Sequence, residues 1–249
     1  MPSIHAGAWR YPGAVADFQC RFEQMKWFAQ TLEQGRFDGL FLPDTLALRA
    51  VGPAALARGH STVTLDPLTL LPALAAVTRH LGLIGTASTT YNDPYMLARR
   101  LASLDHISAG RAGWNLVTSS NASEAGNFGQ KTHMEHSQRY ARAREFTAVM
   151  NGLWDSWEQD AFCRDADSGV FLQVEKMHLL DHHGDYFSVQ GPLNIERSPQ
   201  GRPVIVQAGA SEAGRQVAAE TAEVIFTYQT DLDSAREFYD DMQGRAQAA

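Results

Sequence analysis

The sequence predicts an α/β protein built around a parallel sheet, and two patterns along the chain carry this prediction. Short apolar runs typical of strands alternate with longer stretches of helical period. Two of the helical stretches open with Asp-Pro, at Asp66-Pro67 and Asp93-Pro94, where the carboxylate can cap the helix and proline suits its first turn. Five strand-like runs alternate with helices, whereas a closed barrel of this class needs eight. The residues therefore leave an open sheet and a partial barrel as the two possible architectures.

The amino-terminal part of the chain predicts one helix followed by one strand. Residues 18–34 place aromatic and apolar side chains at helical spacing, with Asp17 as the expected cap and Gly35 as the expected stop. A short apolar strand is predicted at residues 37–43, and Asp44 follows at its end. An acid at that point should face the carboxyl-end surface of the sheet.

The middle of the chain alternates helix and strand after an irregular stretch at residues 47–64. The expected elements are helices at residues 66–79 and 93–106 and strands at residues 81–87 and 112–117. The last of these strands opens into a long run of small polar residues, rich in Gly and Asn, that ends at Gly129. Such a loop at the carboxyl end of a strand is where α/β enzymes usually build their active sites.

The second half of the chain continues the alternation around one irregular segment. Residues 160–202 contain several glycines and histidines and predict an inserted lid or hairpin within a single domain that spans residues 1–249. The regular elements expected around this segment are a helix at 137–157, a strand at 203–209, a helix that follows Ala210-Ser211, a strand at 223–227 and a helix at 231–248.

Composition narrows the classes of protein that the chain can belong to. With 249 residues, 44% of them hydrophobic, it has enough apolar material for one large core or two modest ones. A formal net charge of −7 gives no support to nucleic acid as a partner. Cys20 and Cys163 have no CxxC spacing, which fits a reducing cytoplasm, and no apolar run approaches the roughly 20 residues that span a bilayer. We therefore expect a cytoplasmic protein with no membrane or nucleic-acid partner.

Small polar residues follow each of the five predicted strands. They are Asp44 after the first, Thr86 and Ser88 after the second, Asn115 and Thr118 after the third, Ala210 and Ser211 after the fourth, and Thr227 and Tyr228 after the fifth. At any one strand, such residues are explained as turn formers. Their occurrence at five successive strand ends favours a shared binding site for a polar ligand.

Two local motifs add detail to that site. The Gly-rich turn at residues 207–214 leads from a strand into a helix and predicts free backbone N–H groups for an anion such as phosphate. It is neither GxGxxG nor a P-loop, so it specifies no particular nucleotide. His136 and Tyr140 lie four residues apart, on one face of the predicted helix. The histidines show no HExxH motif or three-ligand spacing, so no metal site is expected. Position alone marks Glu124, Lys131 and Lys176 as possible acid/base or anion contacts, and we assign them no role.

A family resemblance rests on motifs spread over nearly the whole chain. They are Gly110-Arg-Ala-Gly-Trp-Asn-Leu-Val-Thr118, Asn127-Phe-Gly129, His136-Ser-Gln-Arg-Tyr140, and the stretches 37–44, 89–95, 102–106 and 198–209. In this order they resemble the luciferase-like flavin monooxygenases, within which the chain looks most similar to the nitrilotriacetate monooxygenase large component and the dibenzothiophene-sulfone monooxygenase group.

The resemblance implies a TIM-type (β/α) barrel that binds reduced FMN delivered by a separate flavin reductase. The flavin then reacts with O2 to a hydroperoxide that oxygenates a small organic substrate. The residues that the resemblance assigns to FMN are Asp44, Thr86, His136, Tyr140 and Ser211, with Asn115, Ala210 and Ser88 as lesser candidates. His136 and Asn115 are also weak candidates for a catalytic role. The cofactor would carry the chemistry while the protein positions and desolvates it. We also expect a homo-oligomer.

The chain departs from this pattern at both ends. The relatives place their first strand before the loop at residues 5–9, and they continue beyond Ala249 through the last two barrel strands. We therefore expect an incomplete barrel. The alternatives that stay open are a truncated, catalytically silent remnant that binds flavin or a partner, and a deazaflavin-dependent oxidoreductase. A hydrolase or sugar-phosphate enzyme is less favoured, because no nucleophile elbow or carboxylate pair is evident.

Overall fold

The computed structural model describes residues 7–48, 51–59, 63–209 and 211–249. Its α-helices are α1 (Phe22–Gln34), α2 (Pro53–Leu56), α3 (Pro67–Ala75), α4 (Pro94–Ser108), α5 (Glu124–Asn127), α6 (His136–Trp154), α7 (Glu212–Thr221) and α8 (Leu232–Ala248). Its strands are β1 (Gly39–Leu42), β2 (Gly82–Ser88), β3 (Ala112–Val117), β4 (His182–His183), β5 (Ser188–Val189), β6 (Val204–Gln207) and β7 (Val224–Ile225). Short 3-10 helices are η1 (Ala8–Arg10), η2 (Phe18–Cys20) and η4 (Val174–Lys176).

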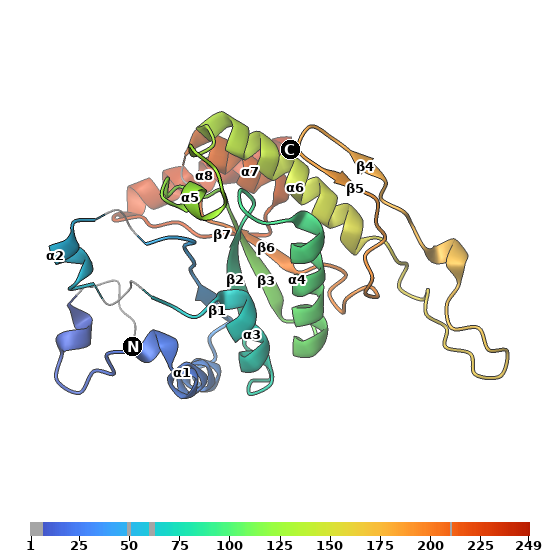
Figure 1. The fold of residues 1–249 in the computed structure, drawn as a ribbon, viewed down its shortest axis with the longest axis horizontal. Coiled ribbons are helices and arrows are strands. Elements are labelled where there is room, and N and C mark those ends of the chain that lie inside the picture. The colour runs from blue at the N-terminus through green and yellow to red at the C-terminus, as the bar shows by residue number, and fades with distance from the viewer. Residues whose placement is uncertain (1–6, 49–50, 60–62, 210) are drawn as a thin grey trace.

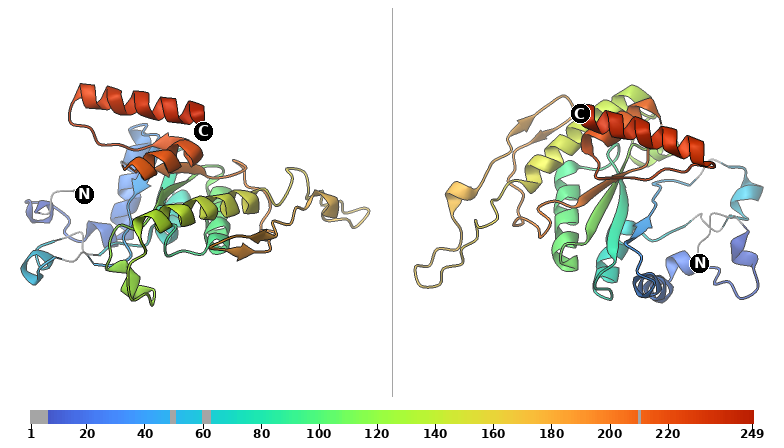
Figure 2. Two further views of the ribbon diagram at one scale, coloured as in Figure 1. Left: turned by 90° about the horizontal axis from the view of Figure 1, so that it is seen from above. Right: turned by 180° about the vertical axis from the view of Figure 1, so that it is seen from behind.

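Among these described residues, five strands form one parallel sheet in the order β1-β2-β3-β6-β7, with helices on its outer side (Figure 1). The predicted α/β class is confirmed. The sheet is curved, because the rings of Phe41 in β1 and Phe226 beyond β7 stack with their centroids 5.8 Å apart although these strands lie at opposite ends of the sheet order. The sheet therefore has the shape of part of a barrel, as the views in Figure 2 also show.

The two faces of the sheet have different roles. Leu83 of β2 and Trp114 and Leu116 of β3 point to the convex face, where they pack against α1, α3, α4, α6 and α7 in two apolar clusters. Residues at the alternate positions, among them Thr86 and Asn115, therefore point to the concave face. Trp114 is fully buried and donates its indole N–H to the carbonyl of Ala87 at 3.0 Å, which fixes β3 against β2.

Both predicted Asp-Pro helix starts are confirmed. The Asp66 carboxylate accepts from the backbone N–H of Thr69 at 2.7 Å, and that of Asp93 from Met96 at 3.0 Å. The predicted cap at Asp17 is wrong: α1 begins at Phe22 without a side-chain cap. The Asp17 carboxylate is instead engaged by the guanidinium of Arg21.

Helix α3 ends at Ala75, four residues before the predicted end at residue 79. Two distant side chains take over the backbone groups beyond its end. The guanidinium of Arg111 donates to the carbonyls of Ala75 and Thr78. One carboxylate oxygen of Glu33 accepts the N–H groups of residues 79, 80 and 81 at 2.8, 2.6 and 3.0 Å. Because these bonds satisfy the chain in a turn, the helix does not need to continue.

The segment between α6 and β6 extends away from the sheet (Figure 1). It contains the antiparallel pair β4–β5 and little other regular structure. Glu145 of α6 anchors this hairpin, since its carboxylate accepts from His182 Nε2 at 3.0 Å and from the backbone N–H groups of Tyr186 and Phe187. The role of residues 160–202 as a lid stays a prediction. Within the described ranges, none of the helices is both long and apolar enough to cross a membrane.

Candidate flavin site

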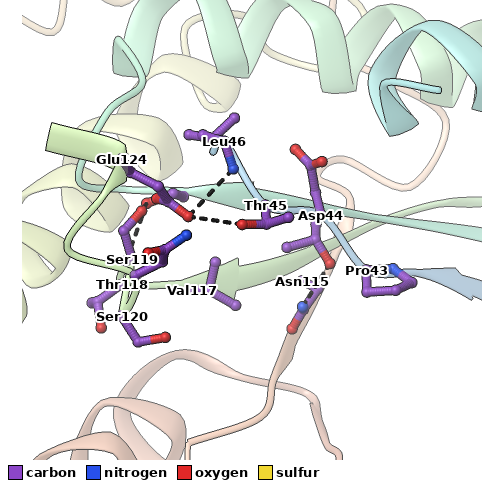
Figure 3. Close-up of a pocket in the computed structure, with 13 residues that line it drawn as sticks. Pro43, Asp44, Thr45, Leu46, Asn115, Val117, Thr118, Ser119, Ser120 and Glu124 are labelled. Carbon is purple, nitrogen blue, oxygen red and sulfur yellow. Dashed lines mark hydrogen bonds between the residues drawn. The ribbon is translucent and has the colours of Figure 1, made fainter. Parts of the chain in front are cut away.

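A cavity of about 480 Å³ opens at the carboxyl ends of β1, β2 and β3 (Figure 3). Three of the residues predicted to bind the cofactor line it together: Asp44, Thr86 and Asn115. Ser88 and Thr118, the lesser predictions at the same strand ends, line it too. The carboxyl ends of neighbouring parallel strands meet at one edge of the sheet, which is why residues far apart in the sequence converge here.

The floor of this cavity is the pair Thr86 and Asn115. They are register partners in β2 and β3, both at most 5% exposed, and Asn115 Nδ2 donates to Thr86 Oγ1 at 2.8 Å. The other amide atom, Asn115 Oδ1, is buried and accepts no hydrogen bond from any described residue. A buried carbonyl oxygen without a donor is unfavourable, so this atom is suited to a hydrogen-bond donor on a ligand.

One wall of the cavity is held by Glu124 of α5. This side chain is 4% exposed, and its Oε1 accepts from Thr45 Oγ1 at 3.2 Å and from the backbone N–H of Leu46 at 3.3 Å. Asn127 of the same helix donates to the carbonyl of Leu46 at 2.8 Å. These hydrogen bonds connect the loop after β1 to the loop after β3, and both loops line the cavity (Figure 3).

The wall also concentrates negative charge. Within the described chain, Glu124 Oε2 is buried and has no hydrogen-bond partner. Asp44 lines the same cavity, and burial raises the pKa of its carboxyl; the charges of Asp66 and Glu124 raise it further, against a lowering by the backbone N–H of Thr45. Nothing in the sequence except its position marks Glu124, because α5 is a single short turn inside a loop without hydrophobic period.

Ser88 acts within the protein framework. Its Oγ lies 2.7 Å from Ser119 Oγ and accepts from the backbone N–H of Thr90 at 3.1 Å. His133, which the sequence did not single out, continues this network, since its ring nitrogens lie 2.8 Å from Tyr91 Oη and 2.9 Å from the carbonyl of Ser119. These contacts fix the loops after β2 and β3 relative to each other.

The remaining predicted residues form a second group at the turn between β6 and α7. Ser211 is the N-cap of α7 and its Oγ accepts from the backbone N–H of Gly214 at 3.1 Å. Tyr140 Oη lies 3.3 Å from Ser211 Oγ, and the His136 and Tyr140 rings are in contact at 4.8 Å between centroids. His136 itself is exposed. Ala210, the other residue predicted at this turn, lies outside the described residues.

Two glycines give this turn its close packing. A side chain on Gly214 would place its Cβ 3.0 Å from the Cα of Gly209 and 3.2 Å from Tyr140 Oη. The turn therefore brings the start of α7, with its free backbone N–H groups, against the tip of Tyr140. Because β3 lies between β2 and β6 in the sheet, this turn and the cavity flank the end of the same strand.

Metal ligands are not assembled at either group. In the parts of the chain that the structure describes, no three His, Cys, Asp or Glu side chains are placed to share an ion. The arrangement instead offers a cavity with buried polar side chains and, beside it, a helix N-terminus with the hydroxyl groups of Ser211 and Tyr140. Together they could accommodate a ligand with a hydrogen-bonding ring at one end and an anion at the other.

Comparison with known proteins gives this arrangement a context. The chain is 52% identical over 243 residues to N-acetyl-S-(2-succino)cysteine monooxygenase of Bacillus subtilis (strain 168), covering 97% of this chain and 54% of that protein. It is 49% identical over 253 residues to nitrilotriacetate monooxygenase component A of Aminobacter aminovorans, covering 98% and 56%. A crystal structure of riboflavin lyase with modified FMN and riboflavin superposes with a TM-score of 0.86 at 36% identity, over 92% of this chain and 52% of that one.

The chain thus spans about half the length of the curated relatives that it matches. The match nevertheless extends over nearly all of its own residues and includes the strand ends that build the cavity and the Ser211 turn. Residues 3–249 match the family described as Bac_luciferase, luciferase-like monooxygenase. This chain belongs to the luciferase-like monooxygenase family.

Proposed function

We propose that the chain is the oxygenase part of a two-component, FMN-dependent monooxygenase with a TIM-type barrel fold. Reduced FMN would come from a separate flavin reductase, and O2 and a small organic compound would be the substrates. The name of one relative, component A of nitrilotriacetate monooxygenase, supports the two-component arrangement. The modified FMN in the riboflavin lyase structure supports the choice of flavin. We further propose that the protein acts in the cytoplasm as a homo-oligomer.

The observation that carries this proposal is the buried polar floor of the cavity. An isoalloxazine ring has N–H groups and carbonyl oxygens along one edge, and it needs buried partners of both kinds. The cavity offers Asn115 Oδ1 as an acceptor, and Asn121 in its lining has a buried Nδ2 donor without a partner among the described residues. The residues present therefore fit the ring of a flavin, with Asp44 and Thr86 beside it.

The Ser211 turn fits the phosphate of FMN. Phosphate is favoured at a helix N-terminus by the free N–H groups and by the helix dipole. The hydroxyl groups of Ser211 and Tyr140 lie at that N-terminus, and His136 adjoins them. With FMN held between the two groups, Tyr140 and Ser211 would orient the phosphate end while Asn115 and Thr86 meet the ring.

Reduced flavin, when bound, supplies the electrons with which O2 is activated. The task left to this chain is to hold the ring and to keep water from it. Leu46 and Val117 provide apolar surface in the cavity lining, and the bond from the Leu46 N–H to Glu124 holds the loop that carries Leu46 at the cavity wall. The family membership and the monooxygenase relatives favour this function over a silent remnant or a deazaflavin enzyme.

The binding step can be tested directly. Purified protein is titrated without oxygen with oxidised FMN and with photoreduced FMN while tryptophan fluorescence is followed. We expect saturable binding of the reduced form. If neither form binds, the proposed function is wrong; if an oxidised deazaflavin binds and FMN does not, the deazaflavin alternative replaces it.

The phosphate assignment has a variant suited to it. In Ser211→Asp the new carboxylate can still cap α7, because aspartate is as good an N-cap as serine, but it sets a negative charge against the phosphate. We expect FMN affinity to fall at least tenfold while riboflavin, which lacks the phosphate, binds as before. Gln243→Glu adds the same charge on an exposed face of α8 and should change neither. Unchanged FMN affinity in Ser211→Asp would remove Ser211 from the phosphate site.

A further inference from the structure

The segment after α6 carries an arm, residues 158–179, that projects from the body of the molecule and leads away from α4 (Figure 1). In the two further views the arm again leads away from the sheet (Figure 2). Its two halves pair with each other near the tip, through an antiparallel bridge between Asp165 and Val170. All of residues 163–171 are exposed. The outer part of the arm therefore lies outside the apolar core of its own chain.

The arm is nevertheless held in one shape. The Nη2 atom of Arg164 donates to both carboxylate oxygens of Glu196, at 2.8 and 2.6 Å, and this pair ties the arm to the body. The same guanidinium lies over the rings of Phe162 and Phe171, 5.6 and 5.7 Å from their centroids. At the tip, the Asp165 carboxylate accepts from two backbone N–H groups at 3.0 and 3.3 Å. A rigid arm loses little conformational entropy when it binds a partner.

Large apolar side chains are exposed on this arm. Val170, Phe171, Val174 and Leu179 are 46%, 60%, 64% and 55% exposed. Single apolar residues on a surface are ordinary, but four of them on one projecting segment are typical of a surface that another protein covers.

The arm is also acidic. Residues 158–179 contain five acidic and two basic residues, which gives a formal net charge of −3. Both basic side chains are used within the chain, Arg164 by Glu196 and Lys176 by an aspartate of the arm. Asp167 and Glu175 are exposed, and their carboxylates form no ion pair with any residue that the structure describes. A surface that complements the arm should therefore be basic and partly apolar.

The outer face of α4 has both properties. Met96, Arg99, Arg100 and Ile107 are exposed there at helical spacing, the two apolar side chains by 40% and 56%. Neither arginine forms an ion pair within the described ranges, and the one acidic residue inside this helix, Asp105, is buried. Because the arm of the same chain leads away from α4, the complementary arm has to come from another molecule.

We propose that residues 158–179 of one copy dock against the outer face of α4 in a second copy, and that a two-fold axis repeats this contact to form a homodimer. Asp167 and Glu175 then face Arg99 and Arg100, while the apolar side chains of the two surfaces cover each other. Such a contact closes, since each copy contributes one arm and one helix face. The inference rests on the homo-oligomer of the proposed function and is independent of the ligand in the cavity.

The test reverses the charges of each surface in turn. Arg99→Glu with Arg100→Glu sets two acids against the acidic arm, and Asp167→Lys with Glu175→Lys sets two cations against the arginines. We expect the dissociation constant of the dimer, measured by sedimentation equilibrium, to rise about tenfold or more in each double variant. An equimolar mixture of the two should restore the dimer, because each arm then meets a face of opposite charge.

Two further variants separate the contact from general effects of charge. Arg10→Glu with Arg236→Glu reverses two exposed arginines on η1 and α8, outside the proposed contact, and should leave the dimer unchanged. Val174→Ser removes exposed apolar surface from the arm without a change of charge and should weaken the dimer about threefold or more. All of these side chains are exposed, so the fold should be retained, as circular dichroism checks.

The outcomes distinguish this inference from the proposals on which it builds. A dimer that survives both charge-reversed double variants, or a mixture in which the two stay apart, overturns the inference and leaves the homo-oligomer to another surface. A wild-type protein that stays monomeric overturns the inference and the homo-oligomer together. The flavin function is decided separately, by the FMN titration.

Discussion

Glu124→Gln tests whether the buried carboxylate in the cavity wall lowers the stability of the fold, because the two side chains have the same shape and differ only in the group at the Oε2 position. The amide oxygen can still accept from Thr45 and Leu46, while the buried Oε2 without a partner among the described residues is replaced by a neutral NH2 group. If Glu124 is held in the wall at the expense of stability, as functional residues often are, the variant should be more stable than the wild type.

The expected magnitude follows from two opposing effects. Replacing a buried ionised oxygen without a partner by a neutral NH2 group, which is itself unpaired, relieves roughly 3 kcal/mol. Converting two charge-assisted hydrogen bonds into neutral ones costs about 1 kcal/mol each, and their lengths of 3.2 and 3.3 Å make this an upper value. The net effect is a gain of about 1 kcal/mol, which for a chain of 249 residues raises the melting temperature by about 2–4 °C.

Glu124→Ala is the matched comparison. It relieves the same charge but also removes both hydrogen bonds and leaves the Leu46 N–H without its acceptor, so we expect a loss of about 2 kcal/mol. Differential scanning calorimetry at pH 7 checks both variants. If Glu124→Gln melts below the wild type by as much as Glu124→Ala, the free oxygen has a partner in solution and the reasoning is refuted.

A second readout follows the charge of Asp44. Its pKa is raised first by burial and then by Asp66 and Glu124, so the pKa in Glu124→Gln should move toward the ordinary value and stay above it. Because a raised carboxyl pKa means that the folded state holds its proton longer, Asp44 lowers stability as pH rises through its ordinary value of 3.8 toward the raised one. That decrease in stability should be smaller in the variant, and carbon-detected NMR titration measures the underlying change in the pKa of Asp44.

Three further predictions concern the framework of the site. Glu33→Ala should lower the free energy of unfolding by about 2 kcal/mol at pH 7, because three backbone N–H groups lose a charged acceptor. These donors lower the pKa of Glu33 despite its burial, so its contribution to stability is complete above the ordinary value of 4.5 and is lost as pH falls through the lowered pKa. Urea unfolding at several pH values measures this dependence. Glu145→Ala should speed amide hydrogen exchange in residues 181–190 at least tenfold without a comparable change in α6, and equal exchange in the hairpin would show that this carboxylate does not anchor it. Gly214→Ala should lower both the melting temperature and the affinity for FMN, since the new Cβ would lie 3.0 Å from the Cα of Gly209. Gly126→Ala, whose Cβ would have no atom within 4 Å, should lower neither.

Local patterns were sufficient to predict much of this fold. Strand β3 was predicted with its observed bounds, and Asp66 and Asp93 were recognised as caps because an N-cap bond spans only three residues. The convergence of Asp44, Thr86 and Asn115 in one cavity also follows from the sequence, once the strands are parallel.

What the sequence did not reveal are contacts that depend on distant partners. Glu124 meets Leu46 across 78 positions of the chain, and α5 has too few residues for a detectable period. The early end of α3 depends on Arg111 and Glu33, neither of which lies in that helix. Asp17 was misassigned as a cap because its preference for helix starts is also satisfied by an ion pair with Arg21.

The position of β3 explains why one strand can serve both parts of the proposed flavin site. Its convex face carries Trp114 and Leu116, which bury their full surface in the core and hold the backbone in place. Its concave face carries Asn115, and its neighbours on either side are β2, which supplies Thr86, and β6, which leads to the Ser211 turn. The strands that lead to the ring contacts and to the phosphate turn are thus held relative to each other by two rows of backbone hydrogen bonds. Because a packed sheet has low compressibility, the distance between these strand ends should be maintained even when the loops that carry Asp44 and Glu124 move.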